Sequence, residues 1–146
     1  MDFPYQYLIR TLAHEMKRHA DRKLDEFGIT QEQSHTLGYL YRHQNDRISQ
    51  QDISIAFNRK GATVSATIKN LEKMDLVYRT VDPSDSRRKI LRLTDKGTAL
   101  VESFINIFGE IETIMLKDFT PEEDAQLKHY FNRMLANLRH DNRVGE

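Results

Sequence analysis

The sequence predicts a mainly α-helical protein with a small β wing, in which a winged helix-turn-helix is flanked by long N- and C-terminal helices. Three observations support this prediction: a hairpin pattern over 77–93, an amphipathic helix immediately before it, and long helical periodicities on both sides. The 146 residues, 38% of them hydrophobic, suit one domain with its own core. We therefore expect a single domain over 1–146, with the winged helix at 30–94 and helical regions at 1–28 and 95–140.

Two helices are predicted in the first third of the chain. Apolar residues recur at helical spacing over 5–27, and Gly28 stands where a C-terminal cap belongs. Thr30 followed by Gln33 is a capping-box pattern, because each residue can satisfy a free backbone N–H of the other. We therefore expect the first helix to end and the second to begin between Gly28 and Thr30.

A short helix and a longer amphipathic helix are predicted next. Ser49 with Asp52 forms a second capping box, which starts the short helix. Over 61–74, a rotation of about 100° per residue places three apolar side chains on one face, which we expect to be buried: Val64, Ile68 and Leu71. The opposite face and its shoulders carry small or hydrogen-bonding side chains: Ala62, Thr63, Ser65, Ala66, Lys69, Asn70 and Lys73. Such a face can approach the floor of a DNA major groove and offer donors to base edges.

The hairpin pattern over 77–93 carries the densest positive charge of the chain. Two runs rich in β-branched and aliphatic residues, 77–81 and 89–93, flank a loop of Asp, Pro and Ser residues that favour turns. Arg87 and Arg88 belong to this loop and Lys89 follows directly, and we expect these three consecutive cations at the exposed tip of the hairpin. An ordinary solvated charge run is the alternative. The position directly after a helix with a polar face instead favours contact with DNA phosphates or the minor groove.

Two further helices are predicted after the hairpin. Thr94 opens a long helix to about residue 117, and about 24 residues at 1.5 Å each span roughly 36 Å. Thr120, Pro121 and Glu123 mark the start of the last helix. A winged helix does not need these apolar helices for its own core, so the surplus predicts a homodimer built from the first, fifth and sixth helices. A helix of that length can set two recognition helices about one DNA turn, near 34 Å, apart.

The formal net charge of the chain is zero, yet its charges are unevenly distributed. The net charge is +5 over 59–96, −1 over 1–58 and −4 over 97–146. A basic middle can bind phosphate locally and in a salt-dependent way. The neutral total therefore argues only against indiscriminate binding to nucleic acid.

Several classes of function are disfavoured by what the sequence lacks. The chain has no cysteine, which excludes disulfides, thiolate zinc sites and thiol redox chemistry. It has no phosphate-binding Gly loop, His-Glu-x-x-His, Gly-x-Ser-x-Gly or candidate triad, so we expect no enzyme and no cofactor. His14 and His19 point about 140° apart on a helix, so we expect no metal site. No run of 18 apolar residues and no cleavable signal occur, so we expect a cytoplasmic protein without a membrane partner.

These residues resemble a known family over nearly the whole chain. The segment 82–88 leading into 93–97 is similar to the wing signature and the following helix start of the MarR family of bacterial transcription regulators. The helix over 61–74 matches the recognition helix of that family. The resemblance implies that Arg87 enters the DNA minor groove and that Asp85 holds it in place.

Two positions depart from the family pattern. Ser84 stands where Arg is frequent, which puts one phosphate contact in doubt, and Asp75 occupies a helix end where Gly is common, although Asp tolerates the left-handed conformation. Stretches within 5–21 and 35–41 further resemble the multidrug-efflux repressors of the family. This narrower resemblance implies a repressor that lipophilic, often cationic, compounds release from DNA.

Two sets of candidate site residues follow from these patterns. The predicted DNA contacts are Gln50, Gln51, Arg59, Ala62, Thr63, Ser65, Ala66, Lys69, Asn70, Asp85, Arg87 and Arg88. The candidate effector-binding residues are Met16, Phe27, Tyr39, Phe104 and Phe108, for which ordinary core packing is the alternative. Aromatic faces can hold a cationic ligand, and Glu15 or Glu32 can balance its charge.

The combined prediction is a homodimeric, sequence-specific regulator that binds a pseudo-palindromic operator in double-stranded DNA. We expect a ligand-released repressor of a multidrug efflux or stress gene, with a small lipophilic effector that can be cationic. Two alternatives stay open. One is a winged-helix module that binds protein, and the other is a metal-responsive regulator of the MarR type.

Overall fold

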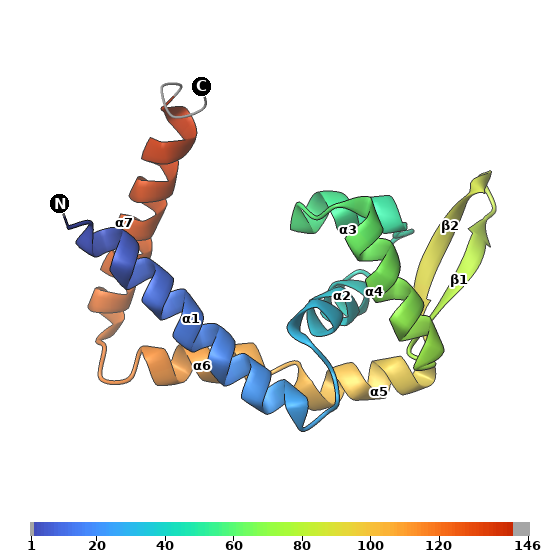
Figure 1. The fold of residues 1–146 in the computed structure, drawn as a ribbon, viewed down its shortest axis with the longest axis horizontal. Helices are drawn as coiled ribbons and strands as arrows, with labels where there is room; N and C mark the ends of the chain where they lie inside the picture. Colours follow the sequence, from blue (N-terminus) through green and yellow to red (C-terminus); the bar gives the residue numbers. More distant parts are fainter. Residues whose placement is uncertain (1, 142–146) are drawn as a thin grey trace. The chain divides into compact units, whose positions relative to one another are not determined.

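The structure, a computed structural model that describes residues 2–141, is mainly helical with one two-stranded sheet, as the sequence predicts (Figure 1). The elements of this part of the chain are α1 (Pro4–Asp25), α2 (Gln31–Arg42), α3 (Gln50–Phe57), α4 (Gly61–Lys73), β1 (Val77–Asp82), β2 (Asp85–Leu93), α5 (Asp95–Phe104), α6 (Ile107–Met115) and α7 (Pro121–His140). They divide into two compact units, the first up to Phe108 and the second from Gly109. None of the helices in the described residues is long and apolar enough to cross a lipid bilayer.

The predicted capping boxes are confirmed at the starts of two helices in the first unit. The Thr30 hydroxyl accepts the Gln33 backbone N–H at 3.2 Å, and the Gln33 side chain accepts the Thr30 N–H at 3.0 Å. Ser49 and Asp52 make the same pair of bonds at 3.3 and 2.8 Å. In the second unit, Thr120 and Glu123 cap α7 in the same way. Each helix start is therefore fixed by residues three apart in the sequence.

Helix α2 contacts α1, α4, α5 and β2, so it lies at the centre of the first unit. Buried apolar side chains surround it, contributed by every element of the unit: Leu24, Leu37, Leu40, Ile53, Val64, Ile68, Leu71, Val77, Ile90, Leu91, Val101 and Phe104. The predicted apolar face of α4 is confirmed, since Val64, Ile68 and Leu71 are at most 3% exposed. Burial of this face fixes the opposite face of α4 toward solvent.

The wing is an antiparallel pair of strands with an irregular register near its tip. Val77 pairs with Leu93 and Val81 with Lys89, but Asp82 pairs with Asp85, so the three residues 86–88 of β2 have no partner on β1. This is a β-bulge, which bends a strand and redirects its side chains. The predicted location of the 87–89 cations at the hairpin tip is therefore wrong. Pro83 and Ser84 form the tip turn, and the cations lie on β2.

The single long helix predicted to run from Thr94 to about residue 117 is also interrupted. Helix α5 ends at Phe104, residues 105–106 form a turn, and α6 begins at Ile107. The β-branched Ile105 and Ile107 flank Asn106, and all three have lower helix propensity than Ala, Leu or Glu. The predicted continuous rod of about 36 Å from Thr94 to about residue 117 is therefore wrong, because two separate helices, α5 and α6, occupy this stretch.

Two chain reversals have the backbone conformations that the sequence predicts. Gly28 follows α1 with φ +71°, in the left-handed region that glycine adopts readily. Asp75 follows α4 with φ +60°, at the position where the family pattern has Gly. The Asp75 carbonyl accepts the Thr94 hydroxyl at 2.6 Å, so this turn joins the end of α4 to the start of α5.

Candidate nucleic-acid interface

The polar face of α4 is open to solvent. Ala62, Thr63, Ala66, Lys69 and Asn70 are exposed, and Ser65 is half-buried. No side chain caps the N-terminus of α4, where Lys60 is the N-cap residue. The helix therefore presents short side chains, free amide donors and the two cations Lys60 and Lys69 to solvent. The exposure of this face agrees with the sequence prediction.

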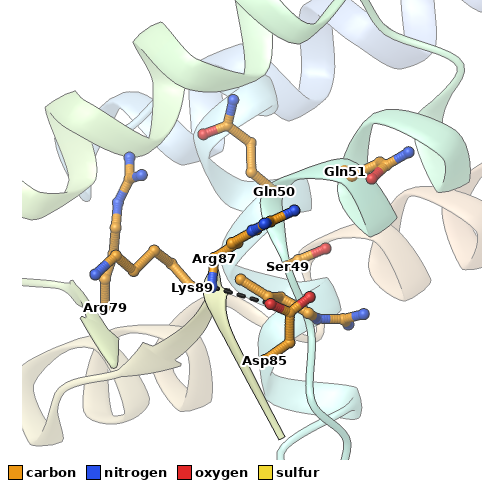
Figure 2. Close-up of a pocket in the computed structure, with 8 residues that line it drawn as sticks. Ser49, Gln50, Gln51, Arg79, Asp85, Arg87 and Lys89 are labelled. Carbon is orange, nitrogen blue, oxygen red and sulfur yellow. Dashed lines mark hydrogen bonds between the residues drawn. The ribbon is translucent and has the colours of Figure 1, made fainter. Parts of the chain in front are cut away.

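A hollow of about 440 Å³ lies between the N-terminus of α3 and the wing (Figure 2). Helix α3 and the residue before it contribute Ser49, Gln50 and Gln51, and the wing contributes Arg79, Asp85, Arg87, Arg88 and Lys89. Four of these eight residues are cations and one is an acid. Arg79 is paired with Glu72 at 2.7 Å and Arg88 with Asp52 at 2.8 Å, so within the described residues Arg87 and Lys89 are the lining cations without an ion-pair partner. The first backbone N–H groups of a helix also carry partial positive charge. The hollow is therefore electropositive, and it is a surface suited to phosphate.

Arg87 and Arg88 are neighbours in the bulge but differ in their surroundings. Arg87 is exposed, and within residues 2–141 its guanidinium has neither a hydrogen bond nor an ion pair. Figure 2 shows its side chain extending over the hollow toward the N-terminal residues of α3. The Asp85 carboxylate accepts the backbone N–H of Arg87 at 3.0 Å. Asp85 thus contacts Arg87 through the backbone N–H of Arg87.

The guanidinium of Arg88 is engaged within the protein. Its Nη2 lies 2.8 Å from Asp52 Oδ2 and also donates to the Arg47 carbonyl, while its Nε lies 3.7 Å from Asp82 Oδ2. Arg47 Nη1 in turn lies 3.3 Å from Asp82 Oδ1. We call these four residues, Arg47, Asp52, Asp82 and Arg88, the wing anchor. Sequence reasoning placed Arg88 among the DNA contacts and missed Arg47, Asp52 and Asp82 as its partners.

Asp82 is the buried member of the wing anchor, with its side chain only 5% exposed. Hydrogen bonds from the backbone N–H and the hydroxyl of Ser84, at 2.9 and 2.7 Å, lower the pKa of the Asp82 carboxyl, and the nearby Arg47 and Arg88 act in the same direction. Asp82 therefore stays ionised at neutral pH. Its carboxylate closes the tip turn of the wing.

Two other predicted DNA contacts have partners inside the protein. Arg59, in the turn between α3 and α4, lies 3.1 Å from the Glu32 carboxylate at the start of α2. The Gln50 amide donates to the Gly61 carbonyl at 3.4 Å. The first contact joins the α3–α4 turn to α2, and the second joins the start of α3 to the start of α4. Gln51 is exposed, and in the described residues its side chain has no hydrogen-bond partner.

The candidate effector residues fall into two aromatic groups. Phe27 and Phe104 meet edge to face with ring centroids 6.2 Å apart. Tyr39 contacts Phe57 at 5.5 Å, and His35 contacts both Phe57 and Phe108. The remaining candidate, Met16, is half-buried on α1. Phe104 is only 2% exposed, which favours core packing for that residue.

Sequence reasoning missed His35 and Phe57 in the second aromatic group. The spacing of His35 and Tyr39, four residues apart on α2, indicates that they share a face. Phe57 and Phe108 come from other elements, and no local pattern places them there. His35 is exposed over part of its surface, and desolvation by the neighbouring groups lowers its pKa.

Comparisons with known proteins agree with this geometry. A model of the MarR family matches residues 27–88. The Staphylococcus aureus MepR–DNA complex is 48% identical, with a TM-score of 0.85 over 93% of this chain and 99% of that chain. A second structure is of MepR as a transcription regulator of the multidrug efflux pump MepA, at 48% identity and a TM-score of 0.76, with the same coverage.

Curated relatives have similar descriptions. The transcriptional regulator BilQ of Clostridioides difficile is 29% identical over 83% of this chain and 80% of its own length. YdgJ of Bacillus subtilis, also described as a transcriptional regulator, is 33% identical over 76% of this chain and 66% of its own length. The winged helix, the basic wing and these likenesses lead to one assignment. The chain belongs to the MarR family of helix-turn-helix transcriptional regulators.

Proposed function

We propose that this protein is a dimeric repressor that binds a specific DNA operator and is released from it by a small lipophilic compound. One observation carries the proposal. The free guanidinium of Arg87, the electropositive hollow beside α3 and the open polar face of α4 all belong to one winged helix-turn-helix. The crystal structure of the MepR–DNA complex, at 48% identity, supports the same role for this chain.

The two parts of this surface suit two kinds of DNA contact. We place α4 in the major groove, where the side chains available to read base edges are Thr63, Ser65, Ala66, Lys69 and Asn70. Arg87 enters the adjacent minor groove, whose negative potential attracts a guanidinium. Gln51, Lys89 and the N-terminus of α3 contact phosphates, which fix the register of the protein on the duplex.

A homodimer is supported by apolar side chains that each unit leaves exposed. In the first unit, the N-terminal half of α1 exposes a set of large apolar residues: Tyr5, Tyr7, Leu8, Ile9 and Leu12. In the second unit, no residue of α7 is buried, and Tyr130, Met134, Leu135 and Leu138 are exposed. Patches of this kind mark association surfaces. A two-fold dimer would present two copies of α4 to an operator with matching symmetry.

An effector can release the DNA only if it binds one conformation of the dimer better than another. We propose that the aromatic residues Tyr39, Phe57, Phe108 and Phe27 contribute to such a site. Their ring faces suit lipophilic cations. The description of MepR as a regulator of a multidrug efflux pump supports an efflux gene as the target. Because the operator would lie in a bacterial chromosome, we place the protein in the cytoplasm.

The test is footprinting of the purified protein on the DNA that flanks its own gene, with and without a cationic dye. We expect a protected segment with approximate two-fold symmetry, and we expect the dye to remove the protection. A scrambled duplex of the same length and composition is the control. Absence of binding to any duplex at low salt would contradict DNA recognition. Protection that the dye leaves unchanged would contradict release by that class of compound.

A further inference from the structure

We propose that Arg88 is a positioning residue, which fixes the wing against α3 so that its neighbour Arg87 reaches the DNA, and that Arg88 itself makes no DNA contact. This inference rests on the DNA-binding function proposed above. It changes the role predicted for Arg88 from the sequence, where both arginines belong to one run of cations. The two side chains differ in their partners.

Two of the three guanidinium nitrogens of Arg88, Nη2 and Nε, lie against acceptor groups of the protein. Nη2 is shared between Asp52 Oδ2 at 2.8 Å and the Arg47 carbonyl. Nε is buried and has no hydrogen-bond partner in the described residues, and it forms a longer ion pair with Asp82 Oδ2 at 3.7 Å. A guanidinium is a rigid planar fork, so the two hydrogen bonds of Nη2 and the ion pair with Asp82 together set its orientation. Turning Arg88 toward a phosphate would leave two carboxylates without this partner.

The wing anchor joins three segments that are distant in the sequence. Arg47 precedes α3, Asp52 lies in the first turn of α3, and Asp82 ends β1 at the tip of the wing. Elsewhere the base of the wing is held by the Leu91 N–H, which donates to the Ile48 carbonyl at 2.8 Å. Toward the tip, a two-stranded hairpin has little stability of its own. The wing anchor therefore determines how the bulge with Arg87 is oriented.

The charges of the wing anchor cancel within the protein. Arg47 and Arg88 supply two positive charges, and Asp52 and Asp82 supply two negative charges. A cation neutralised in this way displaces few counterions from DNA, whereas a free cation such as Arg87 displaces about one. Removal of Arg88 or of Arg87 should weaken DNA binding. Only removal of Arg87 should change the salt dependence of that binding.

The first experiment compares Arg88→Ala and Arg87→Ala by fluorescence anisotropy with operator DNA over a range of salt concentrations. For Arg88→Ala we expect binding weakened by about 2- to 30-fold, the range for residues that act through others, with an unchanged slope of log K against log salt. For Arg87→Ala we expect the magnitude of this slope to fall by about one, because one cation no longer neutralises DNA phosphate. A slope reduced equally in both variants would overturn the proposal.

The second comparison uses Asp52→Asn. A positioning role of Arg88 and a DNA-contacting role of Arg88 predict opposite changes in DNA affinity for this variant. If Arg88 acts through Asp52, loss of the carboxylate loosens the wing and weakens DNA binding. If Arg88 contacts DNA, removing a nearby negative charge frees the guanidinium and strengthens binding. Because Asp52 also caps α3, Glu123→Gln in the capping box of α7 is the matched control for the loss of a capping carboxylate. Unchanged or tighter binding by Asp52→Asn would overturn the proposal.

A third measurement needs no DNA and so separates this inference from the proposed function. Hydrogen exchange of the free protein reports how often the Arg87 amide, which is bonded to Asp85, becomes open to solvent. We expect faster exchange of the Arg87 amide in the bulge in Arg88→Ala, with partial recovery in Arg88→Lys, and wild-type exchange elsewhere in the chain. Unchanged exchange of the Arg87 amide would overturn the positioning role even if the protein binds its operator as proposed.

Discussion

Gly97 lies so close to Leu76 that a Cβ atom added to Gly97 would stand 2.1 Å from the Leu76 carbonyl oxygen. The same carbonyl accepts the backbone N–H of Thr94 at 3.0 Å, and the Thr94 hydroxyl accepts the Gly97 N–H. The first turn of α5 is therefore held directly against the chain that joins α4 to the wing. No other residue has room at position 97, because the obstacle is backbone.

We predict that Gly97→Ala lowers the free energy of unfolding by about 3 kcal/mol or more, at or above the upper range for overpacked sites. Gly109→Ala is the control, since an added Cβ there meets no described atom within 4 Å. That change should raise stability by up to about 1 kcal/mol, because Ala favours helix over Gly. Urea denaturation followed by circular dichroism measures both. Equal effects of the two substitutions would contradict the close approach at Leu76.

A second prediction concerns the left-handed conformation of Asp75. Because φ is +60° there, Gly should be favoured over Asp, and Asp over Ala. We expect Asp75→Gly to stabilise the protein by about 0.5 to 1 kcal/mol, and Asp75→Ala to destabilise it by about 1 kcal/mol. Thermal unfolding of the three proteins should give this order. The reverse order would show that the turn does not depend on this backbone conformation.

Much of this fold follows from local sequence signals. The capping residues Thr30, Ser49 and Thr120 mark three helix starts, because a capping bond joins residues only two or three positions apart. The buried face of α4 follows from its periodicity. The break between α5 and α6 was not predicted, because apolar residues continue at helical spacing across Asn106. The weak helix propensity of residues 105–107 outweighs this apolar periodicity.

The site was predicted less completely than the fold, for a physical reason. Arg87 and Arg88 have the same side chain and adjacent positions, so composition cannot distinguish them. Their different surroundings depend on the bulge at 86–88 and on Asp52 and Asp82, which other segments supply. The aromatic contacts of His35 with Phe57 and Phe108 likewise join three segments. Such long-range pairings depend on the tertiary structure.

A third prediction uses the lowered pKa of His35. Desolvation is the main cause, Glu32 opposes the shift, and Arg42 and Arg59 add to it. The folded protein therefore binds fewer protons at this site than the unfolded chain, so its stability rises with pH. The contribution of His35 to the free energy of unfolding is complete above the ordinary histidine pKa of about 6.5. It is lost as the pH falls from there through the lower pKa that His35 has in the folded protein.

Urea denaturation between about pH 7.5 and 5 measures this effect. We expect the pH dependence of the wild type to be reduced in His35→Phe, which keeps a ring against Phe57 and Phe108. His14→Gln, a change at an exposed histidine of α1, is the control that removes a histidine without altering the contacts of His35. If His35→Phe has the same pH dependence as the wild type, the titration belongs to another group.

A fourth prediction concerns self-association. Leu8 on α1 is 60% exposed in the first unit, and we propose that a second copy of the chain covers it. Leu8→Asp should shift sedimentation velocity from dimer toward monomer, because a buried unpaired carboxylate is costly. Ile55→Asp is the matched control, as Ile55 on α3 is 72% exposed and lies outside the proposed dimer helices. Dissociation by both variants, or by neither, would contradict this placement of the interface.

The most direct test of DNA recognition by the wing is a salt titration of operator binding for wild type and Arg87→Ala. Lys23→Ala, which removes an equal charge from the last turn of α1, is the control. For Arg87→Ala we predict binding weaker by about 1 to 3 kcal/mol and a slope of log K against log salt whose magnitude is smaller by about one, with Lys23→Ala close to wild type. Affinity and slope that match wild type in Arg87→Ala would contradict the central claim that the wing contacts DNA.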